Sequence, residues 1–162
     1  MQLSLKRKGD YAVRAMISVG RHYGTGLRQA RQISTEMHIP YKTLTLILAG
    51  LVAEGLLVAA HGPRGGYRLA RPPAEISLLD IVEAAEGPAT VGHCVLRDGP
   101  CDWEQTCPVH DTWARTQEAL TRKLASISLA EMAAIDAAIE AGSYQPKAPP
   151  HTQPTARHGN RT

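Results

Sequence analysis

The sequence predicts a mostly α-helical chain that carries one small β-hairpin. Residues 8–54 contain three successive segments with apolar side chains at helical spacing. Residues 56–70 contain two short strand-like segments around a glycine-rich turn, and residues 77–141 contain further helical segments. The chain has 162 residues with no Phe and two Trp, so its core must be built from aliphatic side chains.

The first three helices are marked by apolar stripes and by the residues that end them. Residues 8–23, 29–37 and 41–54 each repeat apolar side chains at i, i+3 and i+4. Glycine or proline follows each segment and ends it. The most regular stripe belongs to the third segment and consists of Leu44, Ile47, Leu48 and Leu51.

The hairpin is predicted from two strands on either side of a turn. Residues 56–60 form a short apolar strand, residues 67–70 form a strand of alternating polarity, and His-Gly-Pro-Arg-Gly-Gly separates them. The order helix, helix, helix, strand, glycine turn, strand is typical of a winged helix-turn-helix. The turn lacks the Gly-Lys-Ser/Thr ending of a phosphate-binding loop and opens no helix, so it does not indicate a nucleotide enzyme.

Three helical segments follow the hairpin. Ser77 with Asp80 indicates the start of the first, the second runs from about residue 109 to 126, and a capping-box pattern at Ser128 starts the last one, which ends near Ala141. The long second helix has an apolar stripe that can serve a dimer interface or the core of a single chain. That stripe is Val109, Trp113, Leu120, Leu124 and Ile127.

The net charge of +3 conceals a strong asymmetry along the chain. Residues 1–71 contain 11 basic and three acidic residues, whereas residues 72–142 contain four basic and 12 acidic residues. A basic half of this kind suits a polyanionic partner, although an uneven solvated surface is the simpler interpretation of charge alone. No apolar run reaches 18 residues and no secretory signal is evident, so we expect a cytoplasmic chain with reduced thiols and no membrane association.

The start of the third helix and the turn of the hairpin are the expected DNA contacts. A helix N-terminus favours phosphate, a helix fits the major groove, and an Arg at the tip of a slim hairpin suits the narrow minor groove. Each motif alone can be a plain helix start or hairpin turn, but both together in a basic segment favour DNA. The expected contacts are Arg28, Tyr41, Lys42, Thr43, Thr45, Arg64 and Gly65.

Three cysteines form the second candidate site. Cys94, Cys101 and Cys107 are spaced C-x6-C-x5-C in one aperiodic segment at residues 88–108, and His110 follows. Thiolates confined to a short segment favour a soft metal, and this spacing is wider than the C-x-x-C pairs of zinc knuckles. It suits a bulky iron–sulfur cluster, with three unrelated buried cysteines as the alternative. No cysteine is paired with an evident base and orienting group, so an enzyme is not expected.

These motifs together resemble the IscR/NsrR family of bacterial iron–sulfur transcription regulators. The matching stretches are K-R-K-G-D-Y-A-V-R-A-M, I-P-Y-K-T-L, H-G-P-R-G-G-Y-R-L-A-R, I-S-L-L-D-I-V-E-A-A-E-G and the three cysteines. They cover about residues 1–140 in register. The resemblance implies a homodimer that pairs through the long helix and binds a palindromic operator in double-stranded DNA.

The resemblance also implies a 2Fe–2S or 4Fe–4S cluster on Cys94, Cys101 and Cys107. His110 matches the branch in which a His three residues after the last Cys completes a 2Fe–2S site. Asp10 matches the branch that senses nitric oxide, in which an Asp from the partner's first helix binds a 4Fe–4S cluster. A helix-capping or surface Asp10 and a solvated His110 are the corresponding structural interpretations.

The expected organisation has four parts. Residues 1–72 form the winged helix-turn-helix domain and residues 73–108 the connecting helix and cysteine segment. Residues 109–142 form the dimerisation and C-terminal helices, and residues 143–162 a disordered tail. The expected function is DNA-binding regulation in response to redox state, nitric oxide or iron–sulfur status. The alternatives are a regulator with structural zinc or thiol-based sensing, and a protein-interaction module that does not bind DNA.

Overall fold

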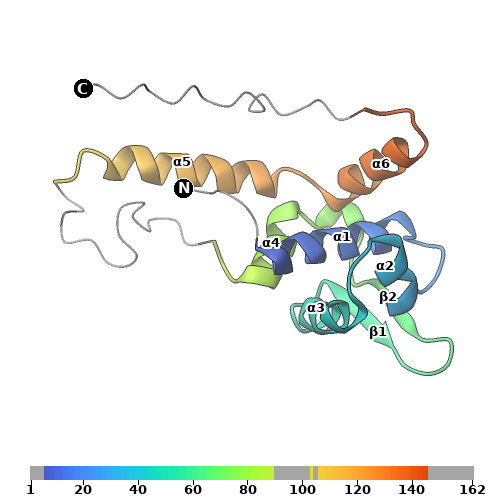
Figure 1. Cartoon of the computed structure of the whole chain (residues 1–162). Helices are drawn as coiled ribbons and strands as arrows, with labels where there is room; N and C mark the ends of the chain where they lie inside the picture. The colour runs from blue at the N-terminus through green and yellow to red at the C-terminus, as the bar shows by residue number, and fades with distance from the viewer. Residues whose placement is uncertain (1–5, 90–102, 104–105, 146–162) are drawn as a thin grey trace, which may run out of the picture.

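In the computed structural model, which describes residues 6–89, 103 and 106–145, six α-helices and one hairpin follow the predicted order (Figure 1). The boundaries lie within two residues of those expected from the sequence. A short 3-10 helix, η1 (Pro73–Glu75), is an element that the sequence did not indicate. The other elements are α1 (Arg7–Arg21), α2 (Ala30–Glu36), α3 (Tyr41–Ala53), β1 (Leu57–Ala60), β2 (Gly66–Leu69), α4 (Leu78–Glu86), α5 (His110–Ala125) and α6 (Leu129–Glu140).

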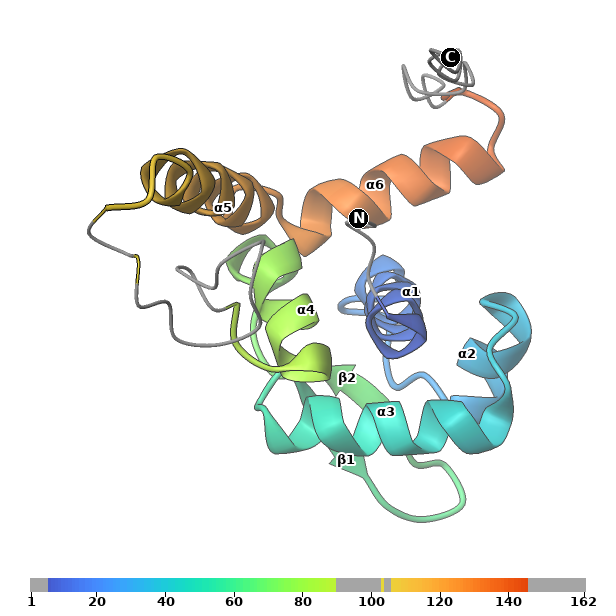
Figure 2. The same ribbon diagram turned by 60° about the vertical axis from the view of Figure 1, so that its left-hand side comes forward.

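The core forms around α1, which packs against α3, α4 and α6 (Figure 2). The predicted apolar face of α1 is buried, because residues at i, i+3 and i+4 share one side of a helix. The stripe of α3 is buried against it, at Leu44, Ile47, Leu48 and Leu51. Removing these aliphatic side chains from water is the main stabilising contribution to the fold.

The hairpin is joined by a third extended segment just before α2. Strands β1 and β2 pair antiparallel with Leu57 opposite Leu69 and Ala60 opposite Gly66. Arg28 then pairs with Tyr67 on the other edge of β2, through two main-chain hydrogen bonds of 2.9 and 2.8 Å. This pairing holds the β1–β2 hairpin, called the wing below, against the segment that leads into α2.

The starts of α4 and α6 lie side by side and have the same local chemistry. Each begins with a Ser whose hydroxyl accepts the N–H three residues later, while the acidic residue at that position accepts the N–H of the Ser. The main chains of the two starts also pair, since Leu78 N–H donates to Ile127 and Leu129 N–H donates to Ile76. Leu129 is fully buried, so α6 contributes to the same core as the N-terminal helices.

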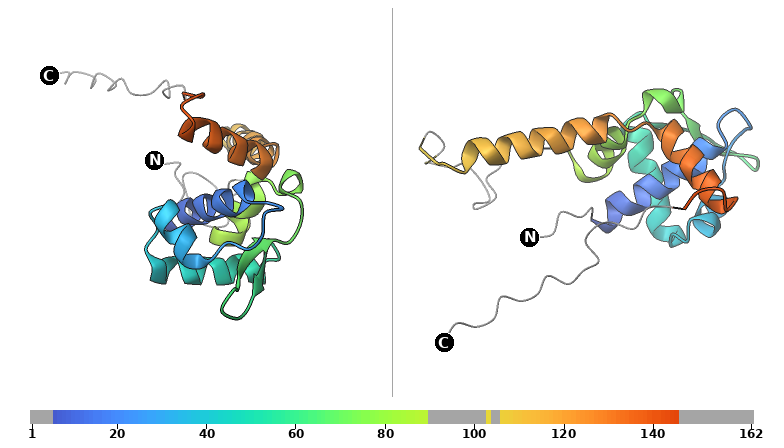
Figure 3. Two further views of the ribbon diagram at one scale, coloured as in Figure 1. Left: turned by 90° about the vertical axis from the view of Figure 1, so that its right-hand side faces the viewer. Right: turned by 90° about the horizontal axis from the view of Figure 1, so that it is seen from above.

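Helix α5 projects away from the rest of the molecule (Figures 1 and 3). Its end at Ala125 lies near α4, and its start at His110 extends outward. No residue of this helix is buried. Among the described residues, no helix is both long and apolar enough to cross a membrane. Most of the aperiodic segment and residues 146–162 of the predicted tail lie outside the described residues.

Candidate nucleic-acid interface and sensing segment

The N-terminal turn of α3 presents its predicted DNA contacts at the surface. Tyr41 and Lys42 are exposed, and Thr43 and Thr45 are partly exposed. The Thr45 hydroxyl donates to the main-chain oxygen of Lys42 at 2.9 Å, so its only proton is already used within the helix. The helix therefore displays a lysine, a phenol and two threonines at the end where its free N–H groups favour phosphate.

Leu46 is a surface residue on the same helix that sequence reasoning missed. It lies one turn after Lys42, on the side opposite the buried stripe, and 75% of its surface is exposed. The helical period could have found this position, because Leu46 does not share the i, i+3 and i+4 spacing of the buried stripe.

A shallow groove connects α3 to the wing and the start of α2. Its walls are formed by Gln29 and Arg31 from the N-cap and first turn of α2, by Tyr41 from α3, and by residues 59–63 and 65–67 of the hairpin. The Arg31 guanidinium lies 5.9 Å from the centre of the Tyr41 ring, within the range of a cation–π contact. Arg31 and His61 were not among the predicted contacts, since neither carries a distinct local motif.

The tip of the wing carries Arg64 in an exposed position, as predicted. Gly65 lies next to it, and a Cβ atom at this position would collide with the main-chain oxygen of Ala60. The close turn therefore requires glycine at position 65. It also keeps the protrusion slim enough to place an arginine into a narrow groove.

Arg28 lies in a different setting from the other predicted contacts. Its guanidinium forms an ion pair with Glu36 at the end of α2, and its side chain is only 17% exposed. Glu36 also accepts a 2.7 Å hydrogen bond from the hydroxyl of fully buried Ser18. Burial raises the pKa of Glu36, but the hydrogen bonds from Ser18 and Arg28 and the charge of Arg28 bring that pKa below its ordinary value. Arg28 thus fixes the segment that holds the wing, and a direct contact with DNA stays a prediction for it.

Arg21 extends this charged network to α6. Its guanidinium lies 3.0 Å from Asp136, forms an ion pair with Glu140, and lies 3.6 Å from Glu36. Burial lowers the pKa of Arg21, but the hydrogen bond and charge of Glu140, together with Asp136 and Glu36, raise it above its ordinary value. The ends of α1, α2 and α6 are therefore fastened by one set of charges.

The structure describes one of the three predicted cluster cysteines. Cys107 is half-buried and lies three residues before the start of α5, where its main-chain oxygen accepts the His110 N–H at 3.3 Å. Cys94 and Cys101 lie outside the described residues. Within residues 6–89, 103 and 106–145, no three His, Cys, Asp or Glu side chains come together as a metal site. Cys107 and His110 lie three positions apart where α5 begins, and thiolate and imidazole are both common ligands of transition metals.

Asp10, the other predicted fourth ligand, lies in the first turn of α1. Its carboxylate accepts a 3.0 Å hydrogen bond from Arg14 and is 43% exposed on its side chain. The preceding Gly9 is buried, and its N–H donates to the Glu86 carboxylate at the end of α4. The start of α1 is therefore tied to the helix that leads into the cysteine segment.

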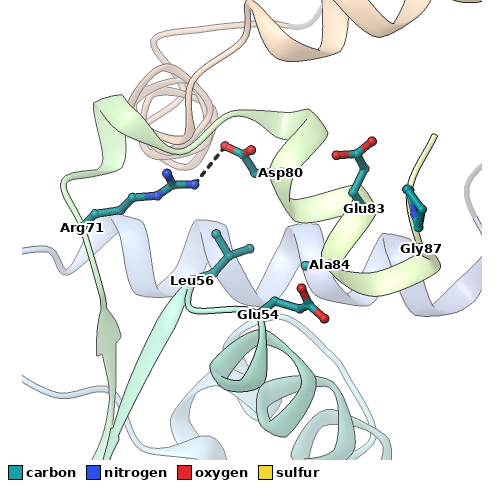
Figure 4. Close-up of a pocket in the computed structure, with 8 residues that line it drawn as sticks. Glu54, Leu56, Arg71, Asp80, Glu83, Ala84 and Gly87 are labelled. Carbon is teal, nitrogen blue, oxygen red and sulfur yellow. Dashed lines mark hydrogen bonds and ion pairs between the residues drawn. The ribbon is translucent and has the colours of Figure 1, made fainter. Parts of the chain in front are cut away.

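A hollow between the base of the hairpin and α4 has a structural role (Figure 4). Arg71 donates to Asp80 at 3.2 Å across it, and Asp80 also caps the start of α4. Glu83, on the same helix, accepts the Ala89 N–H at 2.9 Å. The Arg71–Asp80 contact fastens α4 to the end of the hairpin, and the Glu83–Ala89 contact fixes the chain that leaves α4.

The three-helix unit, the exposed α3 turn and the arginine-tipped wing define the class of winged helix-turn-helix regulators. Within that class the chain belongs to the Rrf2 family, whose model is described as an iron-dependent transcriptional regulator and matches residues 5–135. It is a transcriptional regulator of the IscR type, a DNA-binding class, and not an enzyme. The resemblance seen in the sequence is confirmed.

Curated relatives and solved structures agree with this assignment. The HTH-type transcriptional regulator IscR of Photorhabdus laumondii is 32% identical over 130 residues, covering 80% of this chain and 79% of the relative. The IscR structure from T. potens is 28% identical with a TM-score of 0.67, covering 90% of this chain and 96% of that one. The structure of CymR, the global cysteine regulator of B. subtilis, is 26% identical with a TM-score of 0.69, covering 82% and 98%.

Proposed function

We propose that this regulator acts as a homodimer that binds a palindromic operator and senses redox state, nitric oxide or iron–sulfur status through a cluster on Cys94, Cys101 and Cys107. The observation that carries the proposal is the place of Cys107. It lies three residues before a projecting helix with a partly exposed apolar stripe, in a chain whose N-terminal part is a basic winged unit. This arrangement suits a sensor segment that lies between a dimer interface and the DNA-binding units of the two protomers.

The DNA-binding part of the proposal is supported by the groove between α3, α2 and the wing. Tyr41, Lys42, Thr43 and Thr45 enter the major groove, and Arg64 with Gly65 enters the adjacent minor groove. Residues 1–72 form this DNA-binding unit. The operator is palindromic because the symmetry of a twofold dimer is repeated in its half-sites, which lie about one helical turn apart.

The homodimer is supported by the exposure of the predicted apolar stripe, of which Val109 caps the start of α5 and Ile127 follows its end. Val109 and Leu120 are 43% and 47% exposed, and Trp113, Leu124 and Ile127 are only partly buried. A stripe that served the core of one chain would be buried in it, so a second copy is the natural cover for these side chains. In this proposal residues 73–108 connect the DNA-binding unit to the sensor, and residues 109–142 carry the dimer contact.

The cluster is supported by the chemistry of its donors. Three thiolates bind iron and sulfide well in the reducing cytoplasm, where we place the protein. When bound, a cluster supplies a centre that reacts with oxidants or nitric oxide. His110 is the local candidate for the fourth ligand, and Asp10 of the second protomer is the alternative. The exposed carboxylate of Asp10 would first have to leave Arg14.

Two sets of contacts within the protein connect the sensor segment to the DNA-binding helix α3. Glu86 at the end of α4 holds Gly9 at the start of α1, and α1 packs on α3. The main chains at the starts of α4 and α6 are also paired, and this pairing includes Ile127, which follows α5. A shift of α5 would therefore displace the starts of both helices. A change at Cys107 then alters the relative placement of two α3 helices in the dimer, and with it operator affinity.

A second candidate keeps the DNA-binding role but uses structural zinc or thiol chemistry at the same cysteines. The likeness to CymR, described as a cysteine regulator, favours it as the runner-up. Mass spectrometry of the native protein, purified without oxygen and combined with iron and sulfide analysis, separates the two. The proposal predicts a dimer that contains iron and sulfide. In Cys94→Ala the iron and the sulfide should both be lost. Zinc without sulfide, or a metal-free protein whose operator binding is unchanged by Cys94→Ala, contradicts the cluster.

A further inference from the structure

The outward face of α3 is unusual for a helix that reads DNA. Lys42, Leu46, Ala49 and Ala53 follow one another at i, i+4, i+7 and i+11, opposite the buried stripe, and all four are exposed. Leu46 has the largest exposed fraction of any large hydrophobic side chain in the described part of the chain. After its first turn, the exposed face of the helix is therefore apolar.

Hydrogen-bonding readout is not available along this face beyond Lys42. The helix contains no Asn, Gln, Arg, Asp or Glu, the residue types that pair with base edges through amide, guanidinium or carboxylate groups. Thr45 is next to Leu46 in the chain, and its hydroxyl donates its proton to the Lys42 carbonyl. Leu46 itself can contact a base only through its apolar side chain.

The major groove carries one apolar mark, which is the 5-methyl group of thymine. We propose that Leu46 determines operator specificity by packing against thymine 5-methyl groups in each half-site. The inference rests on the proposed DNA-binding function and names the base feature that α3 selects.

The surroundings of Leu46 favour a nucleic acid over a protein partner. Lys42 lies one turn before it, and Arg31 and Arg64 are exposed on the neighbouring α2 and wing. Helix α3 contains no acidic residue, and residues 1–71 carry eight more basic than acidic residues. An apolar side chain flanked by cations matches a base edge flanked by phosphates.

The test uses an operator selected from random duplexes by the full-length protein. Each thymine of one half-site is replaced in turn by deoxyuridine, which removes only the methyl group, and affinity is measured by fluorescence anisotropy. Wild-type protein should lose about threefold to fivefold in affinity at one or two positions, the loss expected for one methyl group. Leu46→Ala should bind thymine and deoxyuridine operators equally well.

Lys42→Ala is the matched control on the same face. It should weaken binding to both operators to the same extent and reduce the salt dependence, because the lysine charge is attracted to the DNA backbone whether or not the thymine methyl group is present. If wild-type protein binds the operator but shows no preference for thymine at any position, the inference is wrong and the proposed function stands. If Leu46→Ala keeps the preference and a native thermal transition, another side chain reads the methyl group and the inference is also wrong. If no salt-dependent binding occurs with any duplex, the proposed function itself fails.

Discussion

Arg28 and Tyr67 exchange two main-chain hydrogen bonds, although 39 positions separate them in the chain. The Arg28 side chain is bound at the same time by Glu36, which in turn accepts the Ser18 hydroxyl. The wing is therefore placed by the contacts of α1 and α2 as well as by its own turn. Its position relative to α3 is a property of the whole N-terminal unit.

Gly66 is the residue that allows this close pairing. A Cβ atom there would lie 2.7 Å from the Arg28 main-chain oxygen. Gly66→Ala should lower the free energy of unfolding by about 1–3 kcal/mol through this collision and weaken operator binding. Gly50→Ala is the control, because that helical glycine has open space around it and alanine should stabilise α3 by about 0.5–1 kcal/mol. Thermal unfolding and anisotropy check both, and a harmless Gly66→Ala would refute the pairing.

Glu36 should give the fold a distinct pH dependence. Its pKa in the folded state lies below the ordinary value of 4.5, so its stabilising effect is complete above that value and is lost as the pH falls through the folded-state pKa. Glu36→Gln should cost roughly 1–3 kcal/mol at neutral pH, because charged hydrogen bonds to Arg28 and Ser18 are weakened.

The measurement is denaturant unfolding of wild type and Glu36→Gln between neutral pH and pH 3. The difference in unfolding free energy should shrink on the acid side of pH 4.5. Exposed Glu54→Gln, at the end of α3, should show little difference throughout. A gap between wild type and Glu36→Gln that stays constant down to pH 3 would show that the Glu36 charge is not involved.

Arg64 should act through phosphate or minor-groove charge rather than through the fold. Arg64→Ala should leave the unfolding transition unchanged, since the side chain is exposed. It should lower operator affinity and reduce the slope of log affinity against log salt by about one. Full affinity in this variant would remove the wing tip from the interface.

Leu120 should contribute to the dimer. Leu120→Glu places a charge on the α5 stripe and should raise the dimer dissociation constant at least about tenfold, given the ~1.5–3 kcal/mol expected for burying a leucine. Ile139→Glu on α6 is the control, because Ile139 is similarly exposed, at 42% against 47%, but lies outside the stripe. Sedimentation analysis distinguishes them, and equal effects of both variants would contradict an α5 interface.

The sequence predicted the elements whose signals are local. Ser77 and Ser128 mark helix starts because each needs only its own next three residues, and both capping boxes are present. The wing could be predicted equally well, since glycine and proline define its turn. These signals were enough for the fold class and for the exposed turn of α3.

Contacts between segments that are distant in the chain could not be predicted from such local signals. The sequence predicts Arg28 as a DNA contact, whereas in the fold its side chain forms an ion pair with Glu36, eight residues later at the other end of α2. A helical stripe looks the same whether it covers a core or an interface, so only the fold shows that Leu120 is left exposed. Leu46 was missed although the helical period places it opposite the stripe, because composition alone does not distinguish an exposed leucine from a buried one.

In the proposed mechanism, a change at the cysteine segment alters how the two DNA-binding units hold the operator. The decisive measurement is the operator affinity of protein purified without oxygen, determined by anisotropy at fixed salt before and after treatment with nitric oxide. We expect a change of at least about tenfold, a coupling of ~1.4 kcal/mol or more, which Cys107→Ala abolishes. An iron-containing protein whose operator affinity is the same before and after treatment would contradict it.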